Sequence, residues 1–137
     1  MSCILRIIGE DFDVDSFILL SGVSSYCVFY KDEPKSKLKP GGEKYQFSGC
    51  AVDVSIADFD DFTEQEKDAA KYLELNYEKL KLIPSTPEIQ FAVLDFGIEY
   101  DSYKFVQSKY LSTALIKLCA DLGISIELSI YQQITKS

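Results

Sequence analysis

The strongest pattern of apolar and polar residues lies near the C-terminus, over residues 109–133. Apolar residues recur at helical spacing up to Leu122, and Gly123 follows as a helix stop, because glycine adopts the left-handed conformation without strain. From Ile124 onwards apolar and polar residues alternate, which predicts a strand with one face in the core. The row expected to face inward is Ile124, Ile126, Leu128 and Ile130. The outward row, a candidate site on the sheet face for water, a partner or a ligand, is Ser125, Glu127, Ser129 and Tyr131.

The rest of the chain carries weaker versions of the same patterns. Strands are expected over residues 3–9, 26–30, 45–56 and 89–96, and a short helix over residues 14–20 with Asp13 as its N-cap. A capping box at Thr63 and Glu66 predicts a longer helix that ends near residue 82. Ser108 is the expected N-cap of the C-terminal helix. Gly49, where the strand alternation changes phase, predicts a β-bulge.

These elements follow one another in the order β-α-β-β-α-β-α-β. Because strand–helix–strand crossovers are right-handed, the helices should lie on one face of one sheet. We therefore expect a single α+β domain over residues 1–137, a two-layer sandwich with a mixed sheet of about five strands and three helices. Tyr30 lies eight residues after Gly22, and Tyr131 lies eight after Gly123, which suggests a duplicated strand–helix–strand unit.

The composition is that of a soluble globular protein with an acidic surface. Apolar residues make up 47% of the chain and charged residues 26%, and no apolar run has the length of a membrane span or of a signal peptide. We therefore expect a cytoplasmic location. The formal net charge is −8. This charge argues against binding to nucleic acid or to an anionic membrane, and it fits a basic protein partner or simple solubility better.

Cysteine and histidine usage restricts the chemistry. The four cysteines, Cys3, Cys27, Cys50 and Cys119, form no C-x-x-C pair and sit in apolar segments, so they are expected to be core thiols. The chain has no histidine, which excludes Ser-His-Asp and Cys-His catalysis and zinc sites that contain histidine. No catalytic residue, cofactor or metal site is predicted, and the protein is expected not to be an enzyme.

An acidic stretch in the middle of the chain is the main candidate for partner binding. Residues 53–68 contain seven acids and one lysine. Carboxylates here could serve acid–base chemistry or bind magnesium, but their position before a helix also favours the helix dipole. Aromatic side chains flanked by charge are good interface anchors. The candidate partner-binding residues are Asp58, Phe59, Asp60, Asp61, Phe62 and Glu64.

Three other segments have functional alternatives. The acids at residues 11, 13 and 15 have calcium-loop spacing, but the later loop positions do not match, and helix capping explains them better. Residues 31–44 carry five lysines and three acids and are expected to be a solvated loop. Residues 100–110 are rich in aromatics, which would cover the core, form a homodimer face or line a pocket.

The two ends of the chain resemble a known type of domain. The helix end Leu118-Cys119-Ala120-Asp121-Leu122-Gly123, followed by the alternating strand up to Tyr131, resembles the C-terminus of small bacterial domains of unknown function. The opening Ile7-Ile8-Gly9-Glu10-Asp11-Phe12-Asp13-Val14-Asp15 resembles their first strand, acidic turn and short helix. Some related acidic domains are immunity proteins of toxin systems. The resemblance implies an α+β fold and a binding function, and it supplies no catalytic residues.

Three functional hypotheses follow from these patterns. The first is a non-enzymatic, immunity-like binding protein that recognises a basic protein partner through residues 58–66. The second is a small-molecule-binding or enzymatic α+β domain with a tyrosine-lined pocket between sheet and helices. The third is a homodimeric structural module that pairs through an edge strand or through the solvated sheet face.

Overall fold

The structure, a computed structural model, describes residues 2–132. Gln133, the last residue of the C-terminal pattern, lies outside the described residues. The described elements follow the predicted order, except that the helix expected to end near residue 82 is divided at Asn76 into a longer helix, α2, and a single-turn helix, α3. The elements are β1 (Cys3–Gly9), α1 (Val14–Ser21), β2 (Cys27–Phe29), β3 (Ser48–Ser55), α2 (Phe62–Leu75), α3 (Tyr77–Leu80), β4 (Phe91–Tyr100), α4 (Thr113–Asp121) and β5 (Ser125–Gln132).

The strands form one five-stranded sheet in the order β2-β3-β1-β4-β5. β1 is antiparallel to both of its neighbours, β3 and β4, and β2 is antiparallel to β3. These four strands have the order and directions of the ferredoxin-like split β-α-β arrangement. β5 extends this sheet as an outer strand parallel to β4. The mixed five-stranded sheet that was expected from the sequence is therefore confirmed.

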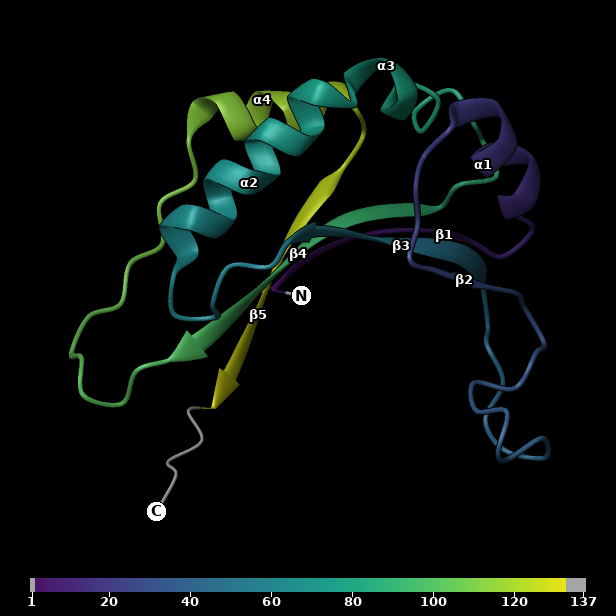
Figure 1. The fold of residues 1–137 in the computed structure, drawn as a ribbon, viewed down its shortest axis with the longest axis horizontal. Helices are drawn as coiled ribbons and strands as arrows, with labels where there is room; N and C mark the ends of the chain where they lie inside the picture. The colour runs from purple at the N-terminus through teal and green to yellow at the C-terminus, as the bar shows by residue number, and fades with distance from the viewer. Residues whose placement is uncertain (1, 133–137) are drawn as a thin grey trace.

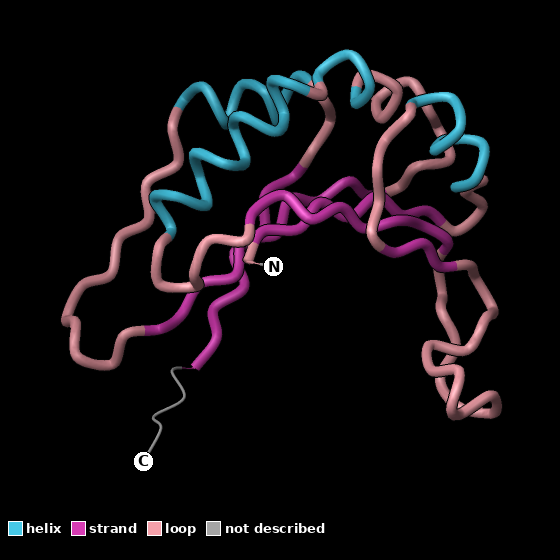
Figure 2. The backbone as a smooth tube through the Cα atoms, in the orientation of Figure 1, coloured by secondary structure: helices cyan, strands magenta, loops and turns pink. Residues whose placement is uncertain are grey.

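All the helices lie on one side of the sheet, and the other side is open (Figures 1 and 2). The predicted two-layer α+β sandwich is thus confirmed. The two strand–helix–strand units are nevertheless built differently. β1 and β2 lie on either side of β3, whereas β4 and β5 are direct neighbours. The shared glycine–tyrosine spacing therefore does not reflect a shared arrangement of strands.

The core lies between the sheet and the helices. In β1 the burial alternates strictly: Cys3, Leu5 and Ile7 are fully buried, while the residues between them are only half-buried on the open face. Ala69 and Leu73 of α2 close over this row, and both are fully buried. Burying each large apolar side chain contributes on the order of 1.5–3 kcal/mol. The strand alternation thus decides which face the helices cover.

Two strand predictions were wrong in their details. β4 continues through Gly97, which was expected to end the strand, because the Gly97 amide donates a 2.6 Å hydrogen bond to the Ser2 carbonyl. β3 begins only at Ser48, and its register with β1 is irregular between Cys3 and Ile4 instead of at Gly49. Beyond Gly97, β4 continues to Tyr100 because it pairs with β5. Both differences therefore arise from pairing with strands elsewhere in the chain, which local alternation does not show.

Helix boundaries follow the side chains that cap them. Asp13 accepts a hydrogen bond from the Ser16 amide, which confirms it as the N-cap of α1. The N-cap of α2 is Asp61 and not Thr63, so the predicted capping box was wrong. The N-cap of α4 is Ser112 and not Ser108, since the aromatic segment before it is a loop.

The cysteine thiols are free, as predicted. Cys3, Cys50 and Cys119 are buried, whereas Cys27 is partly exposed. Burial raises the pKa of the Cys50 and Cys119 thiols to about 11, and it also raises that of Cys3. Among residues 2–132, no helix combines the length and the apolar character that crossing a membrane requires.

Candidate functional site

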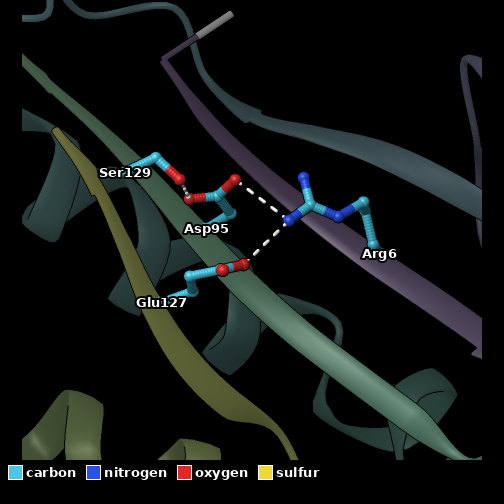
Figure 3. A network of polar contacts seen from close by, with 4 residues as sticks. All are labelled: Arg6, Asp95, Glu127 and Ser129. Atoms are coloured by element: carbon cyan, nitrogen blue, oxygen red, sulfur yellow. Dashed lines mark hydrogen bonds and ion pairs between the residues drawn. The ribbon is translucent and has the colours of Figure 1, made fainter. Parts of the chain in front are cut away.

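The predicted outward row of β5 lies on the open face of the sheet, where it meets a charged pair from two other strands (Figure 3). Arg6 of β1 places its Nη2 atom 3.0 Å from Asp95 Oδ2 of β4 and 3.0 Å from Glu127 Oε2 of β5. Ser129 donates a 2.6 Å hydrogen bond from its hydroxyl to Asp95 Oδ1. The side chain of Asp95 is 12% exposed, so Arg6 and Ser129 offset the cost of burying most of a carboxylate.

This network changes the interpretation of the row. Glu127 and Ser129 are bound to the protein's own side chains, and the Tyr131 ring packs against the Phe59 ring with centroids 5.5 Å apart. Ser125 is exposed at the start of the strand. The polar side chains of this row therefore mainly connect β5 to β1 and β4, and few of them are free to bind a ligand.

Sequence reasoning missed Arg6 and Asp95. Both carried a visible signal, because each is a charged residue inside an otherwise apolar strand. Such a residue needs a partner of opposite charge, but the sequence does not say that β1 and β4 are neighbours. The pairing of Ile4 with Asp95 and of Arg6 with Val93 places the two side chains diagonally across adjacent strands.

Phe59 connects the sheet face to the loop that precedes α2, residues 56–61, which we call the acidic loop. The Phe59 ring lies over Gly97, where a Cβ atom would come within 3.0 Å of the ring. The Phe59 carbonyl accepts a 3.0 Å hydrogen bond from the Glu99 amide, so the loop lies along the end of β4. Phe59 itself is 38% exposed.

Gln65 holds the acidic loop from below. This side chain is completely buried in the first turns of α2. Its Nε2 atom donates to the carbonyls of Asp58 at 3.1 Å and Gly97 at 2.8 Å. The Asp61 amide also donates to the Asp58 carbonyl, at 3.0 Å, and closes a turn. The loop is thus fixed by backbone and buried contacts, and its carboxylates do not hold it in place except at Asp61.

The predicted partner-binding residues divide into exposed and buried members. Asp58, Asp60, Asp61 and Glu64 are exposed, and no ion pair reaches any of them among the residues that the structure describes. Phe62 is only 6% exposed and packs against Phe96 in the core, with ring centroids 5.1 Å apart. The expectation that Phe62 is a surface anchor was therefore wrong, because the first turn of α2 directs it at the sheet.

The acidic loop meets the loop between β4 and α4, residues 101–112, which we call the aromatic loop. Two adjacent hollows, of about 180 Å³ and 210 Å³, lie between the loops. Asp60 and Lys109 line both hollows, Tyr100 lines the first and Tyr110 the second. Sequence reasoning treated these segments as separate clusters, and the fold places them side by side.

The aromatic loop has an ordered core and exposed side chains. The Gln107 side chain bonds the Asp101 backbone at both ends: its Oε1 accepts from the amide and its Nε2 donates to the carbonyl, each at 2.9 Å. The Tyr103 amide donates to the Asp101 carboxylate at 3.0 Å. Tyr103 is 86% exposed and Phe105 is fully exposed, so this loop presents aromatic rings to solvent.

Ser112 connects the two loops at their base. Its hydroxyl donates to Glu66 Oε1 at 2.5 Å and accepts from the Leu115 amide at 3.1 Å. A carboxylate from α2 thereby holds the N-cap of α4. The aromatic loop and the acidic loop are thus positioned by the same pair of helices.

The acids with calcium-loop spacing have structural partners. Asp13 caps α1, and Asp15 accepts a 2.7 Å hydrogen bond from the Tyr30 hydroxyl. This bond to Asp15 raises the pKa of Tyr30. Within residues 2–132, no group of three or more cysteine, aspartate or glutamate side chains is arranged to hold a metal ion. A larger hollow of about 370 Å³ lies beneath α1 and has no tyrosine in its lining.

Comparisons of the chain with protein families, with curated proteins and with solved structures found no match. The function is therefore inferred from the chemistry of the surface alone.

Proposed function

We propose that this protein is a non-enzymatic binding protein that recognises a basic segment of a protein partner where the acidic and aromatic loops meet. The observation that carries this proposal is their juxtaposition. Asp58 and Asp60 are exposed, and Asp60 lines a hollow together with residues of the loop that presents Tyr103 and Phe105 to solvent. Carboxylates and aromatic rings together suit lysine and arginine side chains, which form ion pairs with the former and cation–π contacts with the latter.

Two physical features favour this surface for recognition. The acidic charge attracts a basic partner over a distance of about 8–10 Å at physiological salt and speeds encounter. The loops are also held by Gln65 and Gln107, so binding orders few additional backbone bonds. Rigid aromatic rings on a fixed loop are the kind of residue that carries most of the energy of an interface.

The size of the hollows argues for side chains and against a larger ligand. At about 180 Å³ and 210 Å³ they fall below the ~300–1,000 Å³ typical of small-molecule sites. They lie between two loops and not between sheet and helices, where a tyrosine-lined pocket was expected. An immunity-like role, in which this surface covers a basic site on a toxin, is one form of such recognition and stays a prediction.

A pull-down with charge variants tests the proposal. The double variant Asp58→Lys with Asp60→Lys reverses charge at the junction and leaves the N-cap Asp61 in place. The matched control, Glu74→Lys with Asp121→Lys, changes the net charge by the same amount on exposed positions of α2 and α4. Wild-type protein is expected to capture a basic protein from the lysate of its source organism, and the control is expected to capture it equally.

The junction variant should bind the captured partner at least about tenfold more weakly, mainly through slower association, and the difference should shrink at high salt. Mass spectrometry identifies the partner, and surface plasmon resonance at two salt concentrations measures the rates. Equal affinity of the junction variant and the control, or capture of acidic proteins only, would contradict the proposal.

A further inference from the structure

The two edges of the sheet are built differently. β2, at one edge, has three residues and leads into a lysine-rich arm that carries Pro34 and projects away from the helices (Figure 1). Short strands, lysine and proline are devices that stop a sheet edge from pairing with another chain. β5, at the other edge, has eight residues, and no strand in the described part of the chain pairs with its outer side.

β5 has none of these protective features. Ser125–Gln132 contains no proline, lysine or arginine, and its pairing with β4 runs over eight residue pairs without an irregularity. Its one charged residue is Glu127, whose carboxylate lies 3.0 Å from Arg6, a cation that Glu127 shares with Asp95. The strand therefore presents an edge with a single, partly compensated charge on a protein whose net charge is −8. Two copies can approach along this edge with little repulsion.

The apolar row of β5 is not covered as the sequence predicted. Ile124 is 5% exposed, but Leu128 is 42% exposed and Ile130 is 65% exposed. Their neighbours on β4 in the same row, Phe96 and Ile98, are buried. The core row of the sheet thus continues onto β5 and stops at solvent, so the expectation that the whole row faces the core was wrong.

We infer that a second copy of this chain covers this edge, with β5 of each copy paired antiparallel about a two-fold axis at Leu128. The sequence of β5 is self-complementary about that residue, as a two-fold interface requires. Leu128 of one copy faces Leu128 of the other, and Ile126 of one copy faces Ile130 of the other. On the opposite face Glu127 comes beside Ser129, so no like charges oppose each other.

Other registers are less favourable. A strand slip of one residue would place the apolar row of one copy beside the polar row of the other. Centring the axis on Glu127 would bring two carboxylates face to face, which is destabilising. The Leu128 register joins the two sheets into one continuous sheet of ten strands, which is twice the five strands of each copy.

Light scattering after size-exclusion chromatography tests the dimer. The wild-type chain of 15.5 kDa is expected to elute at twice its mass at micromolar concentration. Ile130→Lys, a substitution at a solvent-exposed site, should give a monomer with an unchanged circular dichroism spectrum. Leu38→Lys, at a site that is 93% exposed in the arm at the opposite edge of the sheet, is the control and should stay a dimer. A wild-type monomer at about 100 µM, or a dimer that survives Ile130→Lys, would overturn the inference.

Disulfide cross-linking tests the register. Residues that pair directly across antiparallel strands have Cα atoms about 4.5–5.5 Å apart, within the range that a disulfide spans. Leu128→Cys should therefore form a covalent dimer on mild oxidation. Ile130→Cys should not, because its two copies would lie four residues apart along the strands. A covalent dimer of the second variant but not the first would overturn the Leu128 register.

The dimer and the proposed partner site fail independently. The junction variant of Asp58 and Asp60 changes capture of a basic protein and leaves β5 intact. Ile130→Lys changes the mass and leaves the carboxylates of the acidic loop intact. A variant that loses partner capture but stays a dimer contradicts nothing about the dimer, and a variant that becomes a monomer but still captures the partner contradicts nothing about the partner site.

Discussion

The Gln65 side chain donates a 2.8 Å hydrogen bond to the carbonyl of Gly97, from the start of α2 to the end of β4. The same nitrogen also donates to the Asp58 carbonyl. This one buried amide therefore connects the helix layer, the sheet and the acidic loop. The Gln65 Oε1 atom has no hydrogen-bond partner among the described residues.

Replacing Gln65 by methionine, which has a similar shape, should destabilise the protein by roughly 1–3 kcal/mol, because the Gly97 carbonyl loses its buried side-chain donor. The Asp58 carbonyl loses the same donor but keeps the Asp61 amide. Urea denaturation measures the change in the free energy of unfolding. Hydrogen exchange at the Glu99 amide, which is bonded to the Phe59 carbonyl of the loop, should become faster. Gln46→Met, at an exposed position, is the control. Unchanged exchange at Glu99 would show that Gln65 does not hold the loop.

Replacing Arg6 by methionine should destabilise the protein by about 1–3 kcal/mol, because a mostly buried Asp95 carboxylate would lose its cation. The pair of Lys35 and Glu43 lies 3.0 Å apart but is exposed on both sides, at 45% and 76%. Lys35→Met should therefore cost no more than about 0.5 kcal/mol. Thermal and urea unfolding compare the two variants. Equal effects would mean that the sheet-face network stabilises the fold no more than a surface ion pair does.

Ser112→Ala should destabilise the protein by about 1–2 kcal/mol, since it removes both the N-cap of α4 and the hydrogen bond to Glu66. Ser108→Ala, at the position that the sequence wrongly favoured as the cap, should change stability by less than about 0.5 kcal/mol. The urea concentration at the midpoint of unfolding, measured for both variants, shows which serine caps α4. A larger effect at Ser108 would contradict the assignment of the cap.

Thiol reactivity should distinguish Cys27 from the other cysteines. Burial shields Cys3, Cys50 and Cys119 and raises the pKa of the latter two to about 11, so at pH 8 very little of their thiolate forms. A chromogenic disulfide reagent should react with one thiol per chain in the native protein and with four after denaturation. Cys27→Ser should remove the fast phase. A fast phase that survives this substitution would show that the core opens more readily than its packing indicates.

Local patterns predicted the layers of this protein. The apolar run over residues 3–9 predicted β1, and a short polar side chain ahead of an apolar helix identified the Asp13 cap. These features depend on residues a few positions apart, whose spacing fixes which side of a strand or helix they occupy. Strand ends, by contrast, depended on partners elsewhere in the chain, as Gly97 shows by pairing with Ser2.

The sequence by itself determined a two-layer α+β fold, the burial of three of the four cysteines and the outward direction of the β5 polar row. Only the tertiary structure decided that Arg6 meets Glu127, 121 residues away, that Phe62 is buried, and that the acidic and aromatic loops meet. The physical reason is that strand order sets these contacts, and strand order follows from the packing of the whole chain. Periodicity determines which face of each segment is buried, but it does not determine which other segment lies beside it.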